Sequence, residues 1–143
     1  MNILIVEDNP LMRALLRETV SEWADGVIEC SDGDEAFAAY EASLPAWVLM
    51  DIQMPRVDGF AASRQIKAVY PEARICIVTD YGDAMMRRAA EAVGATAFVL
   101  KENLRALGKL FGVHAGDVPQ LSLIPKPVEK KASEPISQPT LNL

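Results

Sequence analysis

Residues 46–55, Ala-Trp-Val-Leu-Met-Asp-Ile-Gln-Met-Pro, decide the fold. Ala46–Met50 is apolar throughout, which is typical of a strand that is buried on both faces. Asp51 follows the run directly, and a carboxylate is tolerated there because the end of a strand can be solvated while its interior cannot. The stretch therefore predicts a central strand with an acid at its carboxyl end.

Three other apolar runs also end at polar side chains. They are Ile3–Val6 before Glu7 and Asp8, Ile75–Val78 before Thr79, and Phe98–Leu100 before Lys101. The carboxyl ends of parallel strands open on one edge of a sheet. We therefore expect one acidic pocket at that edge, with a single cation beside it.

Segments with helical features separate the apolar runs. Pro10 suits a first helical turn, and an apolar stripe of Leu11, Leu15, Leu16, Val20 and Trp23 follows it. Asp83 is a plausible N-cap and Gly94 a plausible C-terminal stop for another helix. The pattern predicts strands at 2–6, 27–30, 46–50, 74–78 and 96–100, with helices following at 10–23, from 32 or 33 to Pro45, 59–70, 84–93 and around 104–111.

Five strands alternating with five helices predict an α/β fold with a doubly wound, five-stranded parallel sheet. We expect the strand order 2-1-3-4-5 and helices on both faces, as in a flavodoxin-like three-layer sandwich. This order reverses between the first and third strands, and ligands in such folds bind at the reversal. Asp8 and Asp51 follow those two strands, so topology and motif indicate the same site.

The chain changes character near residue 115, because five of its nine prolines lie in the last 29 of 143 residues. We predict one domain at residues 1–114 and a Pro-rich flexible tail or linker at residues 115–143. Leu121–Ile124 and Leu141–Leu143 are the apolar patches of this tail. Two interpretations of them stay open: docking motifs, or hydrophobic residues in a linker.

Charge and composition exclude several classes. The net charge is −6, with 11 basic and 17 acidic residues in residues 1–114, which argues against direct nucleic-acid binding. No apolar run approaches the ~18 residues of a membrane span, and a strand from residue 2 leaves no room for a secretory signal, so we expect a cytoplasmic protein. We expect Cys30 and Cys76 to be buried thiols. With one histidine and two separated cysteines, the chain has too few ligands for a zinc site.

The acidic pocket indicates phosphoryl chemistry. Two carboxylates at ~4 Å repel by about 4 kcal/mol at an effective dielectric of 20, so the cluster needs protons, partners or a cation. Hard oxygen ligands favour Mg²⁺, with Mn²⁺ as a substitute. Asp51, alone on the central strand, is the candidate nucleophile for an aspartyl phosphate. Asp8 assisted by Glu7 would hold the metal.

The motifs together resemble the receiver domains of two-component response regulators, the CheY-like family, over residues 1–112. The residues that carry the resemblance are Glu7-Asp8, Asp51-x-x-Met54-Pro55, Asp58-Gly59, Thr79 and Phe98-x-x-Lys101. The resemblance implies that Asp51 accepts a phosphoryl group from a sensor histidine kinase or a phosphotransfer protein. It adds the Gln53 backbone carbonyl to Glu7, Asp8 and Asp51 as a Mg²⁺ ligand.

The same resemblance implies a switch. Thr79 and Lys101 would sense the phosphoryl group, and Phe98 would move inward as Thr79 moves toward it. Residues 84–112 would then signal to a protein partner, with homodimerisation on phosphorylation as a further outcome. Such a chain is a signalling phosphoacceptor that catalyses only its own phosphorylation and dephosphorylation.

Departures from the usual pattern leave alternatives. Gln53 and Tyr81 stand where the family tunes access of the hydrolytic water, and an aromatic at 81 predicts slow self-dephosphorylation. Lys101-Glu102 resembles receivers of the NarL/FixJ type, so a fragment of a DNA-binding regulator that lacks its output domain is one alternative. A Mg²⁺-dependent phosphohydrolase is another. It is disfavoured because Gln53 replaces the second acid of those enzymes.

Overall fold

The computed structural model describes residues 1–111. The expected tail at residues 115–143, with its two apolar patches, lies outside the described residues, as does residue 112 of the expected signalling surface. Among the described helices, none has the length and apolar character needed to cross a membrane.

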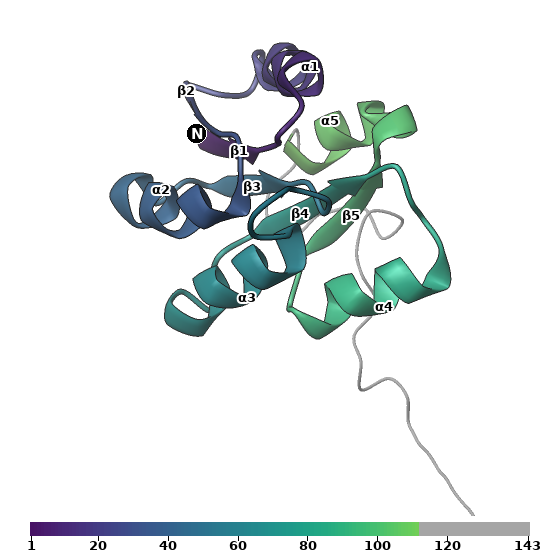
Figure 1. The fold of residues 1–143 in the computed structure, drawn as a ribbon. Coiled ribbons are helices and arrows are strands. Elements are labelled where there is room, and N and C mark those ends of the chain that lie inside the picture. Colours follow the sequence, from purple (N-terminus) through teal and green to yellow (C-terminus); the bar gives the residue numbers. More distant parts are fainter. Residues whose placement is uncertain (112–143) are drawn as a thin grey trace, which may run out of the picture.

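The strands form one parallel sheet. They are β1 (Asn2–Val6), β2 (Gly26–Cys30), β3 (Trp47–Met50), β4 (Ile75–Thr79) and β5 (Ala97–Leu100). Their order is β2-β1-β3-β4-β5, which confirms the predicted topology (Figure 1). The three inner strands are almost wholly buried because helices cover both faces, and this burial accounts for their continuous apolar sequences.

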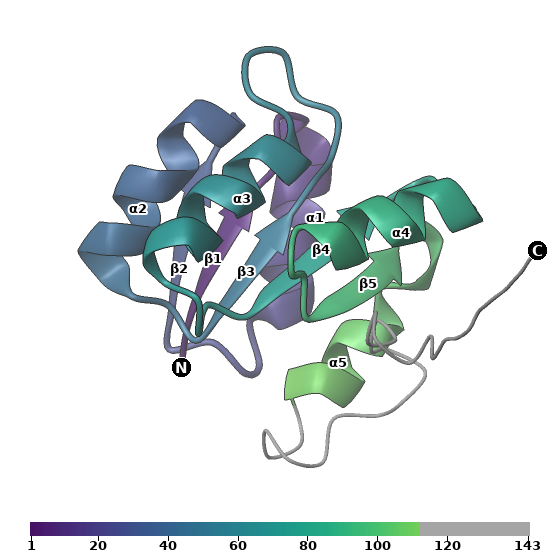
Figure 2. The same cartoon turned by 90° about the horizontal axis from the view of Figure 1, so that it is seen from below.

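The helices sort onto the two faces of the sheet. They are α1 (Pro10–Val20), α2 (Ala36–Ser43), α3 (Gly59–Val69), α4 (Ala84–Ala92) and α5 (Arg105–Phe111), with short 3₁₀ turns η1 (Gly33–Glu35) and η2 (Lys101–Asn103). Helices α1 and α5 pack on one face and α2, α3 and α4 on the other, in agreement with the two apolar clusters of the core (Figures 1 and 2). The predicted three-layer sandwich is confirmed.

Side-chain caps fix the starts of three helices. Asn9 Oδ1 accepts hydrogen bonds from the backbone N–H groups of residues 11 and 12. Asp58 Oδ1 accepts from residue 61, and Asp83 Oδ1 from residue 86. Gly94, which follows α4, has φ +83°, a conformation that favours glycine. The predicted N-cap at Asp83 and stop at Gly94 are therefore confirmed.

The predicted apolar stripe of α1 is wrong at two positions. Leu16 and Val20 are buried, whereas Leu11 is 82% and Leu15 45% exposed. A helix on the outside of a sheet buries one stripe, and here that stripe runs through Met12, Leu16 and Val20. Leu11 and Leu15, four residues apart, lie on a neighbouring stripe that faces outward.

Both cysteines, Cys30 and Cys76, are buried free thiols, as the sequence predicted.

Candidate functional site

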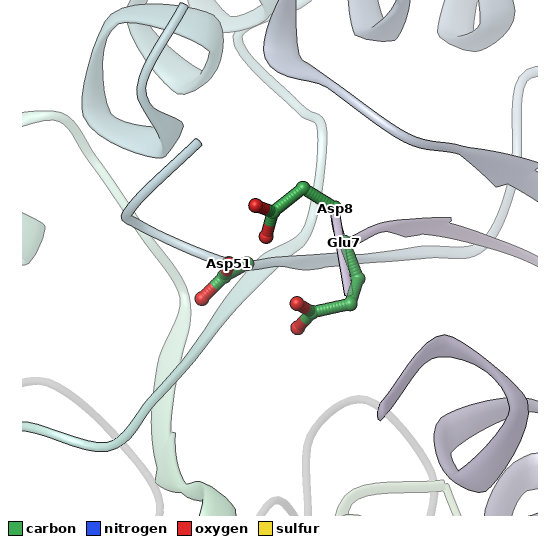
Figure 3. A group of neighbouring side chains, drawn as sticks. All are labelled: Glu7, Asp8 and Asp51. Atoms are coloured by element: carbon green, nitrogen blue, oxygen red, sulfur yellow. The ribbon is translucent and has the colours of Figure 1, made fainter. Parts of the chain in front are cut away.

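Three carboxylates converge at the carboxyl ends of β1 and β3. Glu7, Asp8 and Asp51 each offer an oxygen, and these oxygens lie within 4.8 Å of one another (Figure 3). Glu7 and Asp51 are buried and Asp8 is half-buried. The sheet brings them together because β1 and β3 are adjacent, although 43 positions separate Asp8 from Asp51 in the sequence (51 − 8).

Backbone contacts hold the two acidic strand ends in register. The Asp51 N–H donates to the Val6 carbonyl at 2.9 Å, and the Glu7 N–H donates to the Cys30 carbonyl at 3.0 Å. The start of α3 approaches the Asp51 backbone so closely that a Cβ at Gly59 would lie 1.9 Å from the Asp51 carbonyl oxygen. Any side chain at Gly59 would therefore displace the acidic residue itself.

Lys101, at the end of β5, supplies the cation that the sequence predicted. Its Nζ lies 3.1 Å from Glu7 Oε1 and 3.1 Å from Asp51 Oδ1. Burial alone would lower the pKa of Lys101, but Asp51 and Glu7 outweigh it and raise the pKa above its ordinary value. The lysine is therefore charged, and three carboxylates face one positive group.

Both buried carboxyls are harder to ionise than usual. Burial, and then the negative charge of Asp51, raises the pKa of Glu7 to about 7. Burial also raises the pKa of Asp51, with Lys101 offsetting only part of the effect and Asp8 adding to it. The metal-free pocket therefore carries unfavourable electrostatic energy that a bound cation relieves.

The donor set fits a hard divalent cation. Glu7 Oε1 is buried and lies near Lys101 Nζ, yet it accepts no hydrogen bond of acceptable geometry within the described part of the chain. The carboxylates line a cavity of about 240 Å³, which Gln53 and Thr79 also line. Carboxylates with one or two further oxygens are the ligands that Mg²⁺ prefers. The acidic cluster therefore fits a Mg²⁺ site.

Thr79, Tyr81 and Phe98 lie along the β4–β5 side of the same edge. Thr79 is buried, and its Oγ1 accepts a hydrogen bond from the Tyr81 N–H at 3.2 Å. Phe98 pairs with Ile77, two residues before Thr79, so Phe98 and Thr79 face the same side of the sheet. The guanidinium carbon of Arg87, on α4, lies over the Phe98 ring at 4.6 Å from the ring centroid. Phe98 is buried in this structure, and Tyr81 is half-exposed at the pocket.

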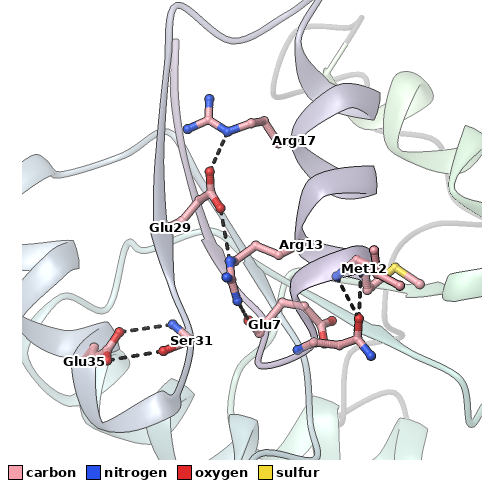
Figure 4. A network of polar contacts seen from close by, with 9 residues as sticks. Glu7, Met12, Arg13, Arg17, Glu29, Ser31 and Glu35 are labelled. Atoms are coloured by element: carbon pink, nitrogen blue, oxygen red, sulfur yellow. Dashed lines mark hydrogen bonds and ion pairs between the residues drawn. The ribbon is translucent and has the colours of Figure 1, made fainter.

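Two residues that orient Glu7 were not predicted from the sequence. The Asn9 N–H donates to Glu7 Oε2 at 3.1 Å, and Arg13 donates from a guanidinium nitrogen to the Glu7 carbonyl at 2.8 Å. Arg13 also pairs with Glu29 of β2, as does Arg17 (Figure 4). The pair Asn9-Pro10 is a recognisable helix start and could have identified Asn9. Arg13 gives no comparable signal, because its partners come from separate elements.

Residues 3–110 match the response regulator receiver domain family, and the chain belongs to this family. It is 39% identical over 98 residues to protein-glutamate methylesterase/protein-glutamine glutaminase 3 of Hahella chejuensis, which covers 66% of this chain but only 28% of that protein. It is 35% identical over 100 residues to the chemotaxis protein CheY of Bacillus subtilis, covering 69% of this chain and 83% of CheY.

Solved structures share the fold. The Ssk1 receiver domain of Saccharomyces cerevisiae, in complex with the histidine phosphotransfer protein Ypd1, has a TM-score of 0.71 and 26% identity, covering 78% of this chain and 86% of that chain. The CheX–CheY–BeF3–Mg²⁺ complex of Borrelia burgdorferi gives a TM-score of 0.71 at 23% identity, covering 80% of this chain and 90% of that chain. The latter likeness shows the fold.

Proposed function

We propose that this chain is a response regulator receiver that accepts a phosphoryl group on Asp51 from a histidine kinase or phosphotransfer protein. The observation that carries the proposal is the convergence of three carboxylate oxygens within 4.8 Å, with Lys101 Nζ 3.1 Å from Asp51. A cluster of that charge stabilises a cation, and a cation next to a nucleophilic carboxylate is suited to phosphoryl transfer.

The residues divide the chemistry among them. Glu7, Asp8, Asp51 and the Gln53 backbone carbonyl would hold Mg²⁺ or Mn²⁺, which supplies positive charge to the phosphoryl oxygens when bound. An Asp51 carboxylate oxygen forms the new bond to phosphorus as the bond to the donor's imidazole nitrogen breaks. Lys101 then moves its pairing from the free carboxylate to a phosphoryl oxygen, and Thr79 donates its hydroxyl to another.

The switch follows from the contacts of Thr79. In this structure its hydroxyl oxygen accepts a hydrogen bond from the Tyr81 N–H at 3.2 Å. A hydroxyl can accept one hydrogen bond while it donates another, so Thr79 could donate to a phosphoryl oxygen and draw the loop after β4 inward with it. Phe98, which faces the same side of the sheet, would occupy the space that Thr79 leaves. The surface at residues 84–112 would thereby change for a protein partner, or for a second copy of the chain.

Two further residues set how long the phosphoryl group persists. Gln53 and Tyr81 both line the cavity around Asp51. Tyr81 is 48% exposed and carries an aromatic ring, and we expect it to shield the acyl phosphate from water. We therefore expect the chain to lose its phosphoryl group slowly by its own hydrolysis.

The domain organisation is part of the proposal. Residues 1–114 would form the receiver, in line with the family match at 3–110, and residues 115–143 a flexible tail or linker. The chain spans 28% of the length of the methylesterase relative and 83% of the length of CheY. These lengths agree with two organisations. The chain could be a receiver that signals through a protein partner, or a receiver separated from an output domain.

Intact-mass spectrometry after incubation with acetyl phosphate tests the proposal. Wild type should gain one phosphoryl group with Mg²⁺ and none with a chelator, while Asp51→Asn should gain none under either condition. Asp34→Asn, a surface acid outside the pocket, should behave as wild type. No adduct on folded wild type in Mg²⁺ would contradict the proposal. Steady turnover of a generic phosphomonoester would favour the phosphohydrolase instead.

A further inference from the structure

The loop between β3 and α3, residues 51–58, makes a long excursion at the edge of the sheet that carries the acidic pocket (Figure 2). Its two ends are tied together, because the Gly59 N–H donates to the Ile52 carbonyl at 2.8 Å. Gln53 stands just inside the loop and lines the cavity. The position of its backbone carbonyl therefore depends on how the rest of the loop is held.

A carboxylate from a distant part of the sequence holds the middle of this loop. Asp32, between β2 and η1, is buried, and its Oδ2 accepts from the Arg56 N–H at 3.0 Å. Its Oδ1 accepts from the Val57 N–H at 2.9 Å and from the Asp34 N–H at 3.3 Å. Two successive N–H groups of the loop thus meet the two oxygens of one side chain.

The neighbouring glycine shows how closely the two loops pack. A Cβ at Gly33 would lie 2.2 Å from the Val57 carbonyl oxygen, so no side chain fits there without moving the loop. Asp32 and Gly33 therefore act at the same contact, one through hydrogen bonds and the other through close approach.

Retaining a buried charge at this contact has a physical reason. A buried carboxylate is costly unless several donors satisfy it, and backbone N–H groups directed at an ionised acceptor form strong hydrogen bonds. Burial would raise the pKa of Asp32, but the N–H groups of Val57, Arg56 and Asp34 outweigh it and hold the pKa below its ordinary value. An asparagine of the same shape would turn an NH₂ group toward one of these N–H groups and lose that contact.

We infer that Asp32 is a positioning residue for metal binding: its carboxylate fixes residues 56 and 57 so that the Gln53 carbonyl is held toward the acidic pocket. The inference rests on the proposed function, because it takes the Gln53 carbonyl as a Mg²⁺ ligand. Residues that orient a metal ligand typically change metal affinity by about 10–100-fold when they are substituted. Asp32 would act through the loop, without touching the ion.

Calorimetric titration of the full chain with Mg²⁺ tests this role. Asp32→Asn should raise the Mg²⁺ dissociation constant about 10-fold. Its phosphorylation rate at saturating Mg²⁺ should stay near that of wild type, because Asp51, Thr79 and Lys101 are intact. Asp34→Asn is the matched control: it removes the exposed ion pair between Asp34 and Arg56, at 3.2 Å, and leaves the Asp32 carboxylate in place. Its dissociation constant should equal that of wild type.

Gly33→Ala gives an independent test, because the added methyl group displaces the loop without altering Asp32. Its dissociation constant should rise in the same direction. A wild-type constant in folded Asp32→Asn or Gly33→Ala would overturn the inference and leave the proposed function standing, even if urea unfolding showed lower stability. Failure of wild type to bind Mg²⁺ would overturn both.

Discussion

The two halves of the sheet edge that carries the site differ in kind. On the β1–β3 half, Glu7 and Asp51 are buried, mutually repulsive carboxylates held by short backbone contacts and paired with one lysine. On the β4–β5 half, Thr79 is a neutral hydroxyl that bonds to its own loop, and Phe98 lies under the side chain of Arg87.

This contrast assigns different energetics to the two halves. The acidic half is electrostatically unfavourable until it binds positive charge, so it would provide the driving force of the proposed switch. In the proposed switch, the β4–β5 half provides the response, because Thr79 is held by one hydrogen bond to its own loop and Phe98 by packing and the Arg87 side chain. A ligand shifts a two-state equilibrium only by its differential interaction with the two states. In the proposed switch, the acidic half would supply that free energy and the β4–β5 half would move.

Substitution of Lys101 should have the largest effect, because this residue connects the two halves. In the proposed chemistry, Lys101→Gln removes the positive donor for a phosphoryl oxygen, and loss of one such donor typically slows the reaction by about 100-fold or more. The rate of adduct formation from acetyl phosphate, followed by mass spectrometry at saturating Mg²⁺, measures this. Lys109→Gln, at an exposed position on α5, is the control and should keep the wild-type rate. An unchanged rate in Lys101→Gln would remove the lysine from the phosphoryl site.

The raised pKa of Glu7 in the acidic half should make the free energy of unfolding depend on pH. The pKa of Glu7 is raised from 4.5 to about 7 in the folded, metal-free chain, so folding favours its protonated form. Stability from this group is fully present below pH 4.5 and is lost as the pH rises through about 7. The free energy of unfolding without Mg²⁺ should therefore fall across this window, by on the order of 2 kcal/mol.

Urea unfolding of three proteins separates Glu7 from the other carboxyls. Glu7→Gln should flatten the decline, whereas Glu22→Gln, at an exposed position on the turn after α1, should reproduce the wild-type profile. Adding Mg²⁺ at pH 8 should raise the stability of wild type more than that of Glu7→Gln, because binding relieves the carboxylate repulsion. A flat wild-type profile without metal would mean that Lys101 neutralises the pocket fully.

The sequence predicted the residues of the pocket better than the residues that hold them in place. Apolar runs ending in Glu7-Asp8, Asp51, Thr79 and Lys101 are local signals, and the parallel topology converts them into one pocket. The role of Asp32 depends on a contact with residue 56, which lies 24 positions away in the sequence. That of Arg13 depends on contacts with Glu7, just after β1, and with Glu29 of β2. The sequence placed Leu11 and Leu15 on one stripe with Leu16 and Val20, although both are exposed, because helical periodicity does not show which apolar residues of a helix the sheet covers.

The smallest expected effect tests the β4–β5 half. Arg87 lies over the Phe98 ring and donates from Nε to the Gly82 carbonyl at 3.3 Å, so it ties α4 to both the aromatic and the loop after β4. Because Arg87 is exposed, its cation–π contact contributes about 0.5–1 kcal/mol. Arg87→Ala should lose that much in urea unfolding, and Arg88→Ala, exposed on the same helix, should lose less. Equal losses would mean that core packing alone holds Phe98, so that moving it is costly and the response must come from the loop.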